Sequence, residues 1–149
     1  MTSIIRRSVV VTLLVGMVAC AGSVPSDLGL HAGKLAACPA SPNCVTSGSA
    51  DEQHSVEALR IDGDAQVAWA SLVMLLKSTP DVRIVTNEPR YLHAEFTSHL
   101  MRYVDDVEFA MSPDRKEIAV RSASRLGYGD MGANRDRIEW IRGELASLD

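Results

Sequence analysis

The middle of the chain carries an apolar stripe of the kind that a buried helix face shows. Large apolar side chains recur there at the i, i+3, i+4 and i+7 spacing of one helix face. These residues are Trp69, Leu72, Val73 and Leu76. Asp64 stands where a capping residue is favoured, and the run Thr79-Pro80-Asp81 ends the pattern. The pattern therefore predicts a helix over residues 65–78.

Four strand-like segments and a second helix follow. The segments cover residues 82–86, 91–98, 103–111 and 116–124. The second apolar stripe consists of Ile138, Ile141, Leu145 and Leu148, with Asn134 before it as the expected helix cap. The order helix, four strands, helix predicts an α+β fold, in which two helices cover one face of a four-stranded antiparallel sheet.

The last two strands are expected to form a hairpin around the turn at residues 112–115. Pro113 suits the second position of a type I turn. With the turn ending at residues 112 and 115, the register pairs Met111 with Lys116, Phe109 with Ile118, Val107 with Val120 and Asp106 with Arg121. This register keeps apolar groups opposite apolar groups and places Glu108 diagonal to Arg121.

The N-terminus has the layout of a secretory signal. Arg6 and Arg7 precede a short apolar run, and small residues lead to Cys20. A cysteine directly after such a cut resembles the bacterial lipobox, in which the thiol is acylated with chains such as palmitate. Secretion without lipid and an uncleaved anchor remain alternatives, although the apolar stretch of 12 residues is shorter than the roughly 20 that span a membrane.

This interpretation divides the chain into three parts. Residues 1–19 are the signal peptide, residues 20–37 are the lipidated cysteine with a flexible tether rich in small residues, and residues 38–149 are a single domain. The protein is then held by its lipid on the periplasmic side of the cell envelope. Ala21 is not the aspartate that resembles an inner-membrane retention signal, which favours the outer membrane over the inner.

Charge and cysteine content narrow the function classes further. Removal of residues 1–19 takes away two arginines and no acid, so the formal net charge moves from −4 to −6. A mildly acidic domain without a basic run is a poor candidate for binding nucleic acid. Cys38 and Cys44 are six residues apart, and in an oxidising compartment they are expected to form a disulfide, with a metal pair or a redox pair as alternatives.

A stretch at residues 120–139 concentrates charge and glycine. It holds four arginines, three acids and three glycines, and residues 127–132 match G-x-G-x-x-G. A dinucleotide loop is not expected, because that motif needs a further parallel strand after its helix. A glycine loop before a helix could instead hold a small anion or a partner. The candidate residues for this binding are Arg121, Arg125, Asn134, Arg135 and Arg137.

The alternative is that the same arginines pair with nearby carboxylates in a polar network. The candidate members of that network are Asp105, Asp106, Glu108 and Asp130. Asp106 and Glu108 share a strand face and could be a hydrolytic pair, but a neighbouring arginine would lower both pKa values and oppose proton donation. His93, Glu95, His99 and Met101 are the weak alternative of a metal site. We expect no cofactor and no metal.

Several motifs resemble one known family. They are Cys38-Pro39-Ala40-Ser41-Pro42-Asn43-Cys44-Val45, Tyr91-Leu92-His93-Ala94-Glu95, Val104-Asp105-Asp106-Val107-Glu108-Phe109 and the stretch from Arg121 to Glu139. Together they resemble domain-of-unknown-function family 1499 over nearly the whole mature domain. The resemblance implies a small domain of bacterial envelope proteins, also found in plastid-bearing organisms, and it implies no activity.

The sequence therefore favours a non-enzymatic envelope lipoprotein. Its domain is expected to present an arginine and carboxylate surface to an envelope protein or a small anion. One alternative is a hydrolase-type enzyme or an anion-binding protein with its site between the hairpin at 103–121 and the glycine loop at 127–134. A purely structural spacer is the third possibility.

Overall fold

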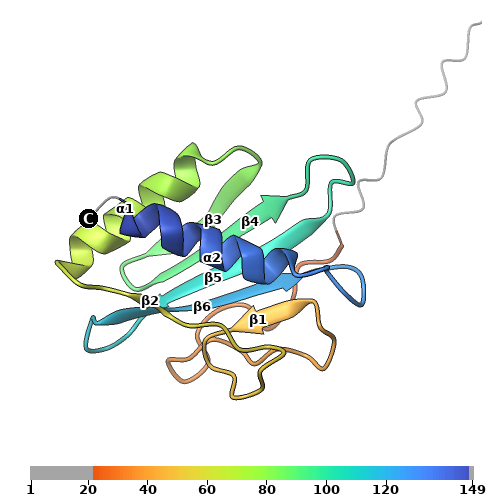
Figure 1. Cartoon of the computed structure of the whole chain (residues 1–149), viewed down its shortest axis with the longest axis horizontal. Helices are drawn as coiled ribbons and strands as arrows, with labels where there is room; N and C mark the ends of the chain where they lie inside the picture. Colours follow the sequence, from red (N-terminus) through yellow and green to blue (C-terminus); the bar gives the residue numbers. More distant parts are fainter. Residues whose placement is uncertain (1–21, 148–149) are drawn as a thin grey trace, which may run out of the picture.

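The computed structural model describes residues 22–147 of the 149-residue chain. Two helices, α1 (Ala65–Ser78) and α2 (Ala133–Ala146), lie together over one face of an antiparallel sheet (Figure 1). The strands are β1 (Cys44–Thr46), β2 (Leu59–Arg60), β3 (Val82–Glu88), β4 (Tyr91–Thr97), β5 (Val104–Met111) and β6 (Glu117–Ser124). No helix within this part of the chain is long and apolar enough to cross a membrane.

The sheet confirms the α+β prediction, but its strand count differs from the expected four. The strand order is β1-β6-β5-β4-β3, and β2 pairs with β6 as well. The four predicted strands are β3 to β6, which form consecutive antiparallel pairs. The two additional strands are three and two residues long, too short to show a periodic pattern in the sequence.

The two helix starts differ in how well the sequence predicted them. At α1, one oxygen of Asp64 accepts hydrogen bonds from the amides of Gln66 (2.7 Å) and Val67 (3.1 Å), as expected. At α2 the prediction of Asn134 as the cap is wrong, because Gly132 occupies that position with φ +88°. Asn134 lies within the first turn, fully buried, and Asp130 accepts its backbone amide at 2.8 Å.

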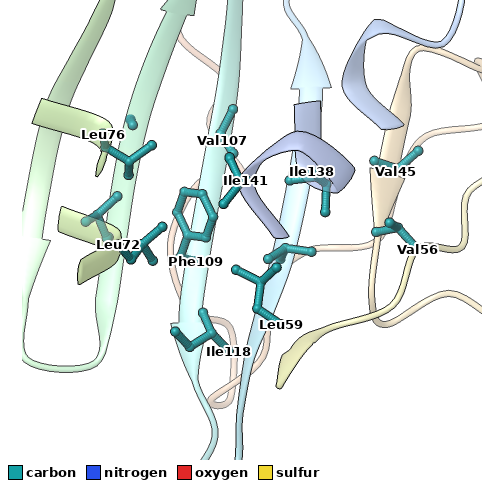
Figure 2. Close-up of a cluster of buried hydrophobic side chains, with 13 residues drawn as sticks. Val45, Val56, Leu59, Leu72, Leu76, Val107, Phe109, Ile118, Ile138 and Ile141 are labelled. Carbon is teal, nitrogen blue, oxygen red and sulfur yellow. The ribbon is translucent and has the colours of Figure 1, made fainter. Parts of the chain in front are cut away.

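The core lies between the helices and the sheet (Figure 2). Leu72 and Leu76 enter it from α1, and Ile138 and Ile141 enter it from α2. The sheet contributes the alternate side chains of its strands, and the edge adds Val45 from β1. The most buried sheet members are Leu92, Ala94, Val107, Phe109, Ile118 and Val120.

The β5–β6 hairpin has the predicted faces but a register shifted by two residues. Met111 lies opposite Ile118, whereas the prediction paired it with Lys116. Glu108 lies directly opposite Arg121, whereas the prediction placed it diagonal to that arginine. A shift of two preserves which side chains share a face. The shift arises because Arg115 adopts a left-handed conformation with φ +58°, which lengthens the loop. The pair that closes it is residues 112 and 117, joined by a 2.9 Å backbone hydrogen bond.

Residues 22–37, which we call the N-terminal strap, lie on the other face of the sheet (Figure 1). The backbone amide of Gly29 donates a 2.7 Å hydrogen bond to Glu108. The carboxylate of Asp27 lies 3.0 Å from the guanidinium of Arg121. The segment that the sequence suggested as a tether therefore contacts β5 and β6 directly. Cys20, the expected site of lipidation, lies outside the described residues.

Candidate functional site

The face of the sheet that the helices leave uncovered carries buried polar side chains. They come from alternate positions of β4, β5 and β6, as the period of two requires. We call them the polar layer, and its members are Tyr91, His93, Glu95, Asp106, Glu108, Arg121 and Arg125. Asp106 and Glu108 are 0% exposed and Arg121 is 3% exposed, so each must find its partners inside the protein.

One half of the polar layer is built around Arg125. Its guanidinium binds both oxygens of Asp106, at 2.8 and 2.7 Å, and one oxygen of Glu95 at 2.6 Å. His93 lies 2.8 Å from Asp106, and the exposed Arg83 binds the other oxygen of Glu95 at 2.7 Å. Burial alone would raise the pKa of Asp106 and Glu95, but the hydrogen bonds from Arg125, with those from His93 and Arg83, lower both values.

The other half is built around Arg121 and Glu108. One nitrogen of Arg121 binds Glu108 at 3.1 Å and another binds Asp27 at 3.0 Å. Tyr91 donates its hydroxyl hydrogen to Glu108 at 2.8 Å. Burial is the larger cause that raises the pKa of Tyr91, and this hydrogen bond to a carboxylate raises it further. The Nε of Arg121 is buried and has no hydrogen-bond partner among residues 22–147.

A separate polar cluster lies on the helix side of the sheet, centred on Asn134. Its side-chain oxygen accepts from Ser122 (2.6 Å) and Arg137 (2.6 Å), and its nitrogen donates to the backbone oxygen of Asn43 (3.0 Å). Arg137 also binds Asp105, and its guanidinium carbon lies 4.9 Å from the centre of the Phe96 ring. This cluster joins α2 to β6 and to the turn before β1.

Arg135 binds backbone oxygens instead of carboxylates. It donates to the carbonyls of Ser55 (2.6 Å), Gln53 (3.1 Å) and Glu52 (3.3 Å). Further along α2, Arg142 donates to the carbonyl of Ala58 at 2.8 Å and also binds the carboxylate of Glu139 at 2.9 Å. These two arginines fasten the loop between β1 and β2 to the helix. Nothing in the sequence indicated this role, because backbone carbonyls are present at every residue.

The structure does not bring the five candidate binding residues into one site. Arg121 and Arg125 belong to the polar layer, whereas Asn134 and Arg137 lie across the sheet and Arg135 lies against a loop. The expected arginine and carboxylate surface is therefore an internal network that the sheet divides between its two faces. Its carboxylates are Asp105, Asp106 and Glu108, each bound by a different arginine, while Asp130 binds the amides that begin α2. Sequence reasoning missed Tyr91 and Asp27 as members.

The alternative of a metal site involved residues that the structure separates. His93 and Glu95 are buried in the polar layer, but the side chain of His99 is 96% exposed in the following loop. Among the residues that the structure describes, no group of three or more histidine, cysteine or acidic side chains could hold a metal ion.

A cavity of about 750 Å³ opens beside the polar layer. It lies between residues 32–38 (the end of the strap and Cys38), residues 46–50 and the β5–β6 hairpin. Six alanines line it: Ala32, Ala36, Ala37, Ala50, Ala110 and Ala119. Polar side chains line it as well: Lys34, Thr46, Ser47, Ser49, His54, Ser112 and Glu117. Sequence reasoning missed this site, because scattered alanines carry no motif.

The predicted disulfide is confirmed and forms part of the cavity's border. Cys38 and Cys44 are bonded, with their Cα atoms 5.6 Å apart. The bond ties the end of the strap to β1, and Cys38 itself lines the cavity. The disulfide therefore holds one wall of the cavity in position relative to the sheet.

Comparison with known proteins gives a family but no activity. No curated protein matches this chain. The family model described as "Protein of unknown function (DUF1499)" matches residues 34–145, a region that contains every strand and nearly all of both helices. The chain therefore belongs to the DUF1499 family.

Proposed function

We propose that this protein is a lipoprotein, anchored through Cys20 on the periplasmic side of the cell envelope, whose domain is a binding module. The ligand we assign to it is a small, mostly apolar molecule held in the 750 Å³ cavity. The outer membrane is the favoured location, on the strength of Ala21 after the lipidated cysteine. An envelope protein that delivers or receives this ligand is the expected partner.

The cavity is the observation that carries the binding role. Its volume lies within the range of about 300–1,000 Å³ that is typical of small-molecule sites. Alanines line it where larger apolar residues would fill the space and strengthen the core. Walls that mix small apolar side chains with polar ones suit a ligand that has an apolar body and a polar end.

The enzymatic alternative has weaker support. A hydrolase at the hairpin would need one carboxyl group that can donate a proton. Asp106 and Glu108 are fully buried, each is bound by an arginine, and the pKa of Asp106 is lowered. An anion bound to these arginines would have to displace the carboxylates that already hold them. Both considerations favour a structural role for the network and a binding role for the cavity.

Two measurements test the proposal. Metabolic labelling with an alkyne analogue of palmitate should mark the wild-type protein and leave Cys20→Ala unmarked. The purified protein should enhance the fluorescence of N-phenyl-1-naphthylamine, a neutral apolar probe, and Ala119→Phe should abolish most of that enhancement by filling the cavity. Ala70→Phe, an exposed site on α1 outside the cavity, is the matched control. Equal probe binding by both variants would contradict the assignment of the cavity.

A further inference from the structure

Half of the exposed large apolar side chains lie in two short loops. Of the twelve such side chains in the described part of the chain, six are in the β4–β5 loop (residues 98–103) and the β6–α2 loop (residues 125–132). They are Leu100, Met101, Tyr103, Leu126, Tyr128 and Met131. Exposed apolar residues gathered in this way mark a contact surface more often than the same residues scattered singly.

The sheet places these two loops beside each other. Thr97 at the end of β4 pairs with Val104 at the start of β5, and Asp105 pairs with Ser124 at the end of β6. The amide of Arg125 also donates a 3.1 Å hydrogen bond to Val104. Both loops therefore leave the sheet at the same end, as Figure 1 shows. We call this end the apolar loop end.

The described chain begins at the same end. A Cβ atom built on Gly22 would lie 2.8 Å from the Cβ of Arg125 and 3.1 Å from the Cγ of Leu126, so the backbone of Gly22 runs directly against the β6–α2 loop. Only two peptide links separate Gly22 from Cys20, and they span at most about 7.6 Å. A lipid on Cys20 would therefore enter the bilayer within a short distance of Leu126.

The exposure of these side chains has no structural explanation within residues 22–147. Met131 is fully exposed, and its backbone has φ +57°, a left-handed conformation that costs a methionine energy. Leu100 is 85% exposed and Tyr128 is 78% exposed. Nearby charges already have partners, since Arg102 binds Asp81 at 2.9 Å and Asp130 binds the amides of Gly132 and Asn134. A weakly polar surface with two tyrosines suits the interfacial region of a bilayer.

We infer that the apolar loop end is a membrane-contact surface, with the β4–β5 and β6–α2 loops resting in the lipid interface beside the acylated Cys20. This inference rests on the proposed lipid anchor. The contact is apolar, because the mature chain carries a formal charge of −6 and the loops offer no basic cluster to anionic headgroups. The domain is thereby held in one orientation. The cavity reaches the β5–β6 turn at Pro113, which lies at the opposite end of strands about 25 Å long, so this part of the cavity is remote from the membrane.

The test places one fluorophore on the full-length lipidated protein. The native cysteines are occupied by the disulfide and, in the proposal, by lipid, so an introduced cysteine is the reactive thiol. Met131→Cys reports on the apolar loop end. Val67→Cys is the matched control, because it replaces another exposed apolar side chain, near the start of α1. Each variant is labelled with NBD, reconstituted into phosphatidylcholine vesicles, and quenched with lipids that carry a nitroxide at shallow or deep positions.

The expected result is strong quenching and a blue shift at position 131, with little of either at position 67. Both effects should persist in high salt, since no charged headgroup is involved. Equal, weak quenching at the two positions in a protein that carries palmitate would overturn the membrane contact while the anchor stands. A blue shift at position 131 in native envelopes but not in vesicles would overturn it in favour of a protein contact. Absence of palmitate at Cys20 would overturn the anchor, and the inference with it.

Discussion

Removal of Arg125 should destabilise the fold far more than removal of the other arginine that binds Glu95. In Arg125→Met, the fully buried Asp106 loses two hydrogen bonds from its one arginine partner within residues 22–147, and Glu95 keeps its contact with Arg83. Breaking a buried ion pair in this way costs about 3–5 kcal/mol, because the Asp106 carboxylate stays buried without its arginine and keeps only its 2.8 Å contact with His93 among the described side chains. For a domain of this size the loss corresponds to a fall in Tm of about 10–20 °C.

Arg83→Met supplies the matched control. Arg83 binds the same carboxylate at 2.7 Å, but its side chain is 69% exposed, so the pair is screened by water. Its removal should cost less than about 1 kcal/mol. Both variants are made in a form that starts at residue 21, and unfolding is followed by circular dichroism during heating and in urea. A third variant, Arg125→Met with Asp106→Leu, also removes the buried carboxylate and should recover part of the stability that Arg125→Met loses.

The reasoning would be refuted if the two single variants lost the same stability. That outcome would mean that water enters or that the local structure rearranges to bind Asp106 when Arg125 is absent. The polar layer would then be more accessible to water than its geometry indicates. A loss in the double variant equal to the sum of the losses from Arg125→Met and from Asp106→Leu, each made alone, would refute the coupling between Arg125 and Asp106.

Three other predictions concern stability. The lowered pKa values of Asp106 and Glu95 stabilise the fold above the ordinary carboxyl pKa near about 4, so urea midpoints should fall as the pH drops below that value, whereas a pH-independent midpoint would contradict the network. Replacing Cys38 and Cys44 together by alanine should cost about 2 kcal/mol, the worth of closing so short a loop, and reducing agent should give the same loss in the wild type. Asp64→Ala should cost about 1 kcal/mol by removing the cap of α1, a loss that Asp64→Asn should largely avoid.

The parts of the fold that local pattern controls could be predicted from the sequence. Residues 65–78 form a helix with its predicted cap, because periodicity and capping act within a few neighbouring residues. The strand faces of β5 and β6 were also correct, since a period of two survives a register error of two. The register itself depended on the left-handed conformation of Arg115, a choice that a non-glycine residue rarely makes and that the sequence does not signal.

The candidate site was harder to predict because its members belong to different surfaces. Arg125 and Arg137 are close in sequence and carry the same charged group. Arg125 binds Asp106 on the face of the sheet that the helices leave uncovered, whereas Arg137 binds Asp105 on the helix side. Adjacent residues of a strand point to opposite faces, so a dense motif divides into two clusters when it folds. Asp27 could not be assigned at all, because 94 positions separate it from Arg121.

The strap has a consequence for where this domain must begin. The family match starts at residue 34, after both Asp27 and Gly29. A fragment cut at that boundary would keep every strand and both helices, yet Arg121 and Glu108 would each lose a partner and face water on an unfinished surface. The region that the family model matches would then be shorter than the region that folds. Residues 22–33 are in this sense a structural part of the domain, and replacing them with a generic linker would remove contacts of the fold as well as change the length of the chain that precedes it.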